Sequence, residues 1–253
     1  MRDGAAPPSR RATPSRRRLL VAGGAAVIGA VTGRAAAVDE SGRGGFTLFT
    51  FGDSVLDCGV YNAFGLHPGG LIVRNDDARF PDFKGRDLRS SRGAVRLEHR
   101  AVDGATVDGL ATQARGLRPP PGPGVALLTV GGNDLLRGLA GDAGPGLRRF
   151  EGLLNRFLQA LPVRPVLLGT VYDPTFGDDA LNFLPIEPRL ARANLRRVNQ
   201  AIGESASRFG ALVDLHAHFL QGDPSWYTRI IEPSLTGASE IRRAFLPALG
   251  LPG

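Results

Sequence analysis

Short runs of apolar and β-branched residues alternate along this chain with segments in which apolar residues recur every three or four positions. The clearest run, residues 46–51, is too short for a helix and ends at Gly52, which is typical of a buried strand. Similar runs follow, separated by polar or glycine-rich residues. The pattern predicts strands at residues 46–51, 96–102, 125–130, 165–171 and 211–215.

Helical spacing occurs between these strands. One predicted helix face is formed by Leu147, Phe150, Leu154, Phe157, Leu158 and Leu161. Further helices are predicted at residues 107–117, from about 188 to 209, and at 241–248. Short buried strands separated by helices indicate a parallel sheet with helices on both faces, so we expect one α/β domain. Residues 61–96 follow neither pattern and are expected to form a long connection, a kind that is usually functional or mobile.

The first 37 residues differ in charge from the rest. They hold seven arginines and one aspartate, a net charge of +7 − 1 = +6, so the whole-chain value of +7 leaves +1 for residues 38–253. Arg16 and Arg17 precede an uncharged apolar run at 19–33, and the alanines at 35–37 fit a signal-peptide cleavage site. The pattern resembles a twin-arginine export signal, which is read by a receptor.

The sequence therefore predicts a signal peptide over residues 1–37 and a domain over 38–253. The protein is expected to be exported to the periplasm or secreted from a bacterium, with the twin-arginine machinery as its partner during translocation. An uncleaved N-terminal anchor is the alternative. A nearly neutral domain without a basic stripe argues against nucleic-acid binding.

The composition also limits cofactors. Cys58 is the only cysteine, which excludes an intramolecular disulfide and zinc sites built on thiolates. The glycine clusters match neither dinucleotide-binding nor phosphate-binding patterns. We expect no cofactor and no metal.

Polar residues gather where three predicted strands end. Asp53 and Ser54 follow the first strand, Gly104 follows the second and Asn133 follows the third. Because carboxyl ends of parallel strands meet at one edge, Ser54 is a candidate nucleophile there. The backbone N–H groups of Ser54 and Gly104 and the side-chain amide of Asn133 are candidate donors to a developing oxyanion. Ser54 as a helix cap and Asn133 as a turn former are the structural alternatives.

These residues resemble the sequence blocks of the SGNH or GDSL hydrolases. Gly52-Asp53-Ser54-Val55 is similar to the first block, residues 103–106 to the second and residues 131–134 to the third. The resemblance covers about residues 46–249. It implies a flavodoxin-like three-layer α/β/α sandwich with about five parallel strands, and metal-independent ester hydrolysis. The related elbow G-x-S-x-G does not fit, since Leu56 stands where it requires glycine.

The last block departs from the family pattern. The family has Asp-x-x-His before its final helix, where this chain has Arg229 and Glu232 at the same spacing from a proline and a glycine. The resemblance therefore leaves the general base open. Glu232 is one candidate, with Arg229 as its charge partner, although a carboxylate of ordinary pKa is a weaker base than imidazole.

Histidines supply the other candidates. His216 and His218 follow the fifth predicted strand, and Asp214 is placed to orient one of them. His67 in the long connection is a further possibility.

Two hypotheses follow. The first is an exported serine ester hydrolase, esterase- or lipase-like or a carbohydrate O-acetyl esterase, acting on a small-molecule, glycan or lipid ester. The second is a catalytically weakened protein of the same fold that binds an acyl or glycan ligand. A base beside Ser54 distinguishes the first from the second.

Overall fold

The computed structural model describes residues 45–253, so the predicted export signal lies outside the described residues. Its main feature is a parallel sheet of five strands in the order β2-β1-β3-β4-β5. The strands are β1 (Phe46–Gly52), β2 (Val95–His99), β3 (Gly124–Thr129), β4 (Val166–Gly169) and β5 (Gly210–Val213). All five predicted strands are confirmed, although the second, fourth and fifth end two or three residues earlier than expected.

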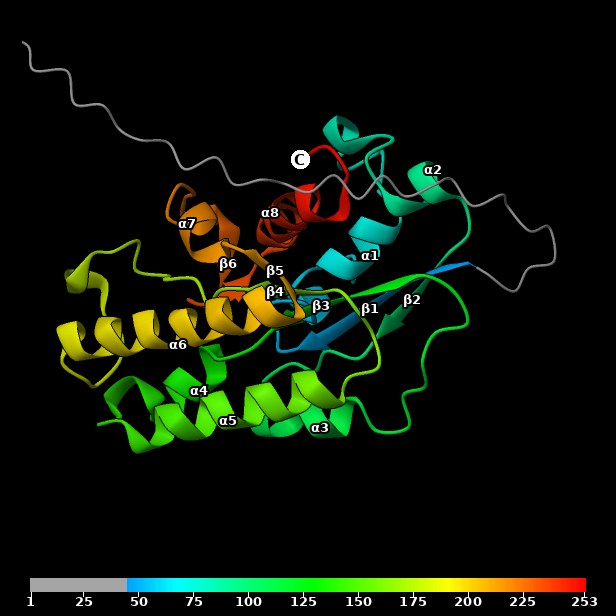
Figure 1. Ribbon diagram of the computed structural model, residues 1–253. Helices are drawn as coiled ribbons and strands as arrows, with labels where there is room; N and C mark the ends of the chain where they lie inside the picture. Colours follow the sequence, from blue (N-terminus) through cyan, green and yellow to red (C-terminus); the bar gives the residue numbers. More distant parts are fainter. Residues whose placement is uncertain (1–44) are drawn as a thin grey trace, which may run out of the picture. The chain divides into compact units, whose positions relative to one another are not determined.

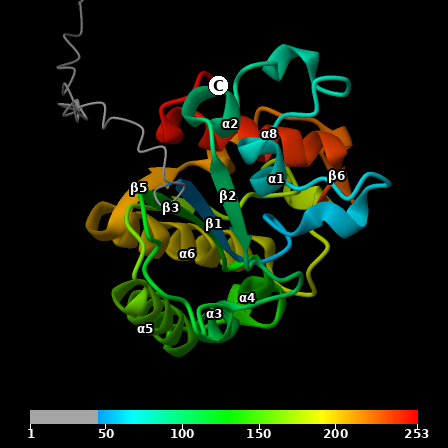
Figure 2. The same cartoon turned by 90° about the vertical axis from the view of Figure 1, so that its right-hand side faces the viewer.

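Helices cover both faces of this sheet (Figure 1). One face carries α3 (Leu110–Gln113), α4 (Gly132–Leu136), α5 (Pro145–Ala160) and α6 (Pro188–Phe209). The opposite face carries α1 (Pro68–Val73), α2 (Leu88–Arg92), α7 (Leu215–Phe219) and α8 (Leu235–Phe245). Figure 2 shows the sheet between the two helical layers. The architecture is the predicted three-layer α/β/α sandwich.

Two hydrophobic cores lie between these layers because side chains alternate along each strand. In β1, Phe49 and Phe51 pack with residues of α5 and α6, whereas Leu48 packs with residues of α1 and α8. All three are at most 1% exposed. The near-continuous apolar runs in the sequence reflect burial on both faces.

The helix predictions were less accurate than the strand predictions. The connection at 61–96 contains α1 and α2, which are too short to show a helical repeat. The helix predicted at 107–117 is only a 3₁₀ turn followed by α3. The last helix begins six residues earlier than predicted, at Leu235, where the Ser234 side chain accepts the backbone N–H of Gly237 as an N-cap. No helix within residues 45–253 has the length and apolar character needed to cross a membrane.

The sheet order determines where a ligand can bind. From β1 the chain passes to β2 on one side, and β3 then pairs with β1 on the other. A crevice opens at the carboxyl ends of the strands at such a switch point. Residues that follow β1 and β3 face each other there, and these include Ser54 and Asn133.

Candidate active site

Ser54 lies in a tight turn directly after β1. The Asp53 carbonyl accepts the backbone N–H groups of Leu56 and Asp57, both at 3.1 Å. Gly52 enters the turn with φ 115°, a conformation that favours glycine. Ser54 is 6% exposed, so its hydroxyl is shielded from bulk water.

Gly104 lies in a second turn, after β2. The carbonyl of Val102 accepts the backbone N–H of Ala105 at 3.1 Å, and Gly104 has φ 74° at the third position of this four-residue turn. Within residues 45–253 we find no hydrogen-bond acceptor for the backbone N–H of Ser54 or Gly104. These groups therefore remain available as donors.

Residues that follow β3 hold the Gly104 turn in place. Asn133 Nδ2 donates to the carbonyl of Ala105 at 3.1 Å, and Arg137 donates to the carbonyl of Gly104 at 3.0 Å. The Asp134 carboxylate accepts the backbone N–H of Val107 at 3.1 Å. An amide nitrogen carries two hydrogens, so Asn133 keeps one for another acceptor.

Glu232 lines the same pocket as Ser54. It belongs to strand β7 (Glu232–Pro233), which pairs with β6 (Tyr227–Thr228), and its carboxylate lies near enough to the Ser54 side chain for that side chain to lower the Glu232 pKa. Glu232 Oε2 is buried and has no hydrogen-bond partner in the described part of the chain. Desolvation by burial raises the Glu232 pKa, although the neighbouring Ser54 side chain acts in the opposite direction. A carboxylate with a raised pKa is a better proton acceptor than an ordinary glutamate.

Two opposite charges also act on Glu232. Asp103 raises its pKa and Arg229 lowers it. The Arg229 guanidinium lies over the Tyr61 ring, 5.0 Å from its centroid, and the Tyr61 hydroxyl donates to Asp103 Oδ2 at 2.6 Å. Arg229 and Ile230 have φ of 47° and 77°, so the β6–β7 turn carries backbone strain beside the site.

The structure places the other predicted bases elsewhere. Asp214 accepts the backbone N–H of Ala217 and the Thr170 hydroxyl, both at 3.0 Å, and caps α7 rather than orienting a histidine ring. His218 Nε2 lies 3.1 Å from Glu240, and His216 Nδ1 is buried without a partner in the described chain. Neither ring lies among the described residues that line the pocket beside Ser54.

The His67 ring packs against His99 in a tilted arrangement, with ring centroids 4.1 Å apart, and likewise does not line that pocket within the described residues. Burial is the main reason why its pKa is lowered to about 4. Of the four predicted bases, Glu232 is thus the one that the described structure brings to Ser54.

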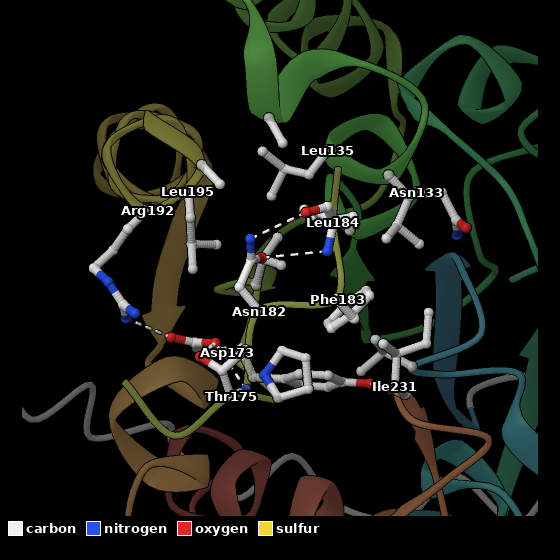
Figure 3. A pocket seen from close by; sticks show the side chains of 18 of the residues that line it. Asn133, Leu135, Asp173, Thr175, Asn182, Phe183, Leu184, Arg192, Leu195 and Ile231 are labelled. Atoms are coloured by element: carbon white, nitrogen blue, oxygen red, sulfur yellow. Dashed lines mark hydrogen bonds and ion pairs between the residues drawn. The ribbon is translucent and has the colours of Figure 1, made fainter. Parts of the chain in front are cut away.

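A pocket of about 130 Å³ opens beside Ser54 and Glu232. Its wall is mainly apolar, as Figure 3 shows for Leu135, Leu184, Leu195 and Ile231. An ion pair between Arg192 and Asp173, at 2.8 Å, forms one side. Asp173 also accepts both the backbone N–H and the hydroxyl of Thr175, so its charge is paired rather than offered to a ligand.

Metal ligands are not gathered at this site. Within residues 45–253, no group of three or more His, Cys, Asp or Glu side chains has the arrangement needed for a metal ion. Cys58 is fully buried, and burial raises its pKa to about 12.

Residues 50–237 match the model of the GDSL-like lipase/acylhydrolase family, and this segment contains the three blocks and Glu232. The chain belongs to this family. Membership assigns it to the hydrolases that act on ester bonds. Among curated protein sequences, none matches this chain.

Solved structures share the GDSL hydrolase fold of this chain. An α/β hydrolase, LAE5, from the metagenome of Lake Arreo, Spain, is 24% identical, with a TM-score of 0.57 over 82% of this chain and 96% of its own. The acetylxylan esterase Axe2 of Geobacillus stearothermophilus is 21% identical, with a TM-score of 0.59 over 83% of this chain and 96% of its own. Two further structures are of catalytic mutants of Axe2, in which a serine or a histidine is replaced.

Several residues of this GDSL site were not predicted from the sequence. Asp57, Tyr61 and Asp103 are joined near Ser54 by hydrogen bonds between distant parts of the chain. Asp57 lies two residues after the first block and Asp103 begins the second block, and this was the only available signal. Phe183 and Leu184 come from a segment without a regular apolar repeat, and nothing in its sequence marked it as a pocket wall.

Asp53 yields a stability prediction. Its carboxylate is 2% exposed and accepts the Thr129 hydroxyl at 2.8 Å and the backbone N–H of Val55 at 3.2 Å. Burial raises the Asp53 pKa from 3.8 to about 6. The native state therefore binds this proton more tightly than the unfolded state, and the associated stability is lost as pH rises through about 6.

The Asp53→Asn variant should be about 2 kcal/mol more stable than the wild type at pH 8, because asparagine keeps an acceptor oxygen and carries no charge. At pH 4 the advantage should disappear. Urea denaturation at both pH values measures this difference. A stability advantage of Asp53→Asn over the wild type that is smaller at pH 8 than at pH 4 would contradict this prediction.

Proposed function

We propose that this chain is an exported serine esterase that uses Ser54 as nucleophile and Glu232 as general base on esters of short apolar acyl groups. The placement of Ser54 and the Glu232 carboxylate side by side in one pocket carries this proposal, because a serine needs a base close to its hydroxyl. The export part rests on the paired arginines, apolar run and alanines of residues 1–37.

The reaction proceeds in two steps. Glu232 takes the Ser54 proton as Oγ bonds to the acyl carbon, and the carbonyl electron pair moves onto oxygen. The oxyanion is stabilised by the N–H groups of Ser54 and Gly104 and by the Asn133 amide. When the oxyanion collapses, the bond to the leaving alkoxide breaks, and the alkoxide receives the proton from Glu232. In the second step Glu232 deprotonates a water molecule, which attacks the acyl carbon. Collapse of the second oxyanion then breaks the bond to Ser54 Oγ, which regains its proton from Glu232, and releases the acid.

The pocket indicates the acyl group. A dry cavity of about 150 Å³ holds a molecule the size of benzene, so a pocket of similar size accommodates about four to six carbons. Its apolar wall favours a hydrocarbon chain over a sugar ring, since unpaired hydroxyls in such a wall would lose their hydrogen bonds to water. Acetylxylan, named for a structural neighbour, is the alternative substrate.

Hydrolysis of aryl esters of increasing acyl length, from acetate to decanoate, tests the proposal. The chain without residues 1–37 should show its highest kcat/KM near four to six carbons, and Ser54→Ala should lower kcat about a thousandfold or more. A phosphonate ester should label Ser54 in the wild type and leave Ser54→Ala unlabelled by mass spectrometry. If wild type and Ser54→Ala are equally inert on all of these esters and on acetylated xylan, the binding-protein hypothesis replaces the enzyme.

A further inference from the structure

We propose that Asp57 is a positioning residue that sets the distance between the Ser54 nucleophile and the Gly104 donor, a role that rests on the proposed function. Asp57 does not line the pocket beside Ser54 among the described residues, so any effect on the reaction must pass through other groups.

The Asp57 side chain connects the two catalytic turns. Its own backbone N–H donates to the Asp53 carbonyl at 3.1 Å, so Asp57 belongs to the Ser54 turn. Its Oδ2 accepts the backbone N–H of Asp103, at 2.9 Å, one residue before Gly104. One carboxylate therefore links the turn after β1 to the turn after β2.

The sheet fixes the orientation of this carboxylate. His99 Nε2 lies 3.1 Å from Asp57 Oδ1, and His99 Nδ1 lies 2.7 Å from the hydroxyl oxygen of Thr50. A carboxylate accepts hydrogen bonds, so Nε2 carries the proton and a neutral ring accepts the Thr50 hydroxyl at Nδ1. Thr50 and His99 are partners across β1 and β2, and Thr50 is fully buried.

The Gly104 turn is thus held from two directions. Asn133 and Arg137 hold the carbonyls of Ala105 and Gly104 from the β3 side, and Asp57 holds the Asp103 N–H from the β1 side. Asp57 ties the turn directly to the Ser54 turn through its side chain, in addition to the backbone bond from the Val102 N–H to the Gly52 carbonyl and the bond from the Tyr61 hydroxyl to Asp103. Because an oxyanion donor acts only at hydrogen-bond distance from the developing charge, release of this tie should weaken stabilisation of the transition state.

A comparison of oxygen esters with thionoesters tests the role. Sulfur in place of the carbonyl oxygen accepts hydrogen bonds poorly. The ratio of kcat/KM for the oxygen ester to that for the thionoester therefore measures how much the oxyanion donors contribute to catalysis. Asp57→Ala should lower kcat on the oxygen ester about tenfold to a hundredfold, with little change in KM, and should lower the oxygen-to-sulfur ratio about tenfold. Asp57→Asn keeps an acceptor oxygen once its amide has rotated, and should restore most of the ratio.

Asp76→Ala is the matched control. Asp76 has a similarly exposed side chain and accepts the backbone N–H of Arg79 at 3.2 Å, in a turn outside the two catalytic turns. It should leave the ratio unchanged. If Asp57→Ala does not fold, His99→Ala provides the test, because it frees the Asp57 carboxylate to rotate and should lower the ratio about threefold.

An unchanged ratio in the folded Asp57→Ala or, failing that, His99→Ala variant overturns the positioning role while leaving the esterase intact. Absence of ester turnover in the wild type, or full activity in Ser54→Ala, overturns both the esterase and the positioning role.

Discussion

Replacement of Glu232 with glutamine should lower kcat for ester hydrolysis about a hundredfold to ten-thousandfold, with KM within about twofold of the wild type. Glutamine has the same shape and an acceptor oxygen, but its amide cannot take the serine proton. Steady-state kinetics on an aryl ester of about four carbons measures both constants. The loss falls on kcat because the proton moves only in the chemical steps.

Glu240→Gln is the control for this result. Glu240, on α8, is also a partly buried glutamate. It pairs with His218 and Arg243, and it does not line the pocket in the described chain. Its replacement should leave kcat close to the wild-type value. A Glu232→Gln variant with nearly wild-type kcat would show that another group takes the proton, and His216→Ala and His218→Ala would then identify it.

Replacement of Gly52 with alanine should cost more than about 4 kcal/mol of folding free energy, or prevent folding altogether. An added Cβ would lie 1.6 Å from the Thr129 carbonyl oxygen and 2.7 Å from its carbon. Both atoms belong to the backbone of β3, so no side-chain rotation can relieve the overlap. The φ of 115° adds strain for any residue with a Cβ.

Gly116→Ala separates these two causes. Gly116 has φ 72°, and a Cβ there would meet no atom within 4 Å. Its replacement should cost only about 1 kcal/mol, from the backbone conformation alone. Denaturant unfolding of both variants gives the comparison, and equal losses would mean that the contact with Thr129 is not the dominant cause.

The fold could be predicted because strands of a sheet that is covered by helices on both faces are buried on both sides. Such strands therefore appear in the sequence as continuous apolar runs. Residues 46–51 and 125–130 gave this signal directly. The short helices α1 and α2 could not be predicted in the same way. Five of the six residues of α1 are buried, so no polar face marks a repeat.

The sequence predicted only those residues of the candidate site that directly follow a recognisable strand. Ser54, Gly104 and Asn133 follow strands whose carboxyl ends meet, so their proximity follows from the topology. Glu232 was one of four candidates for the base, since a contact between residues 54 and 232 depends on the β6–β7 hairpin. Asp57 and His99 act across a separation of 42 residues and left no recognisable spacing.

The role of Glu232 is tested most directly by the pH dependence of kcat/KM in two variants that should shift the Glu232 pKa in opposite directions. Glu232 must be ionised to act as base, so activity should fall as pH drops through its raised pKa. Arg229 lowers that pKa and Asp103 raises it. The Arg229→Gln variant should therefore move the acidic midpoint to higher pH, and Asp103→Asn should move it to lower pH. Displacements of the predicted opposite signs would support Glu232 as the general base. Midpoints that coincide with the wild type in both variants, or move in the same direction, would contradict it.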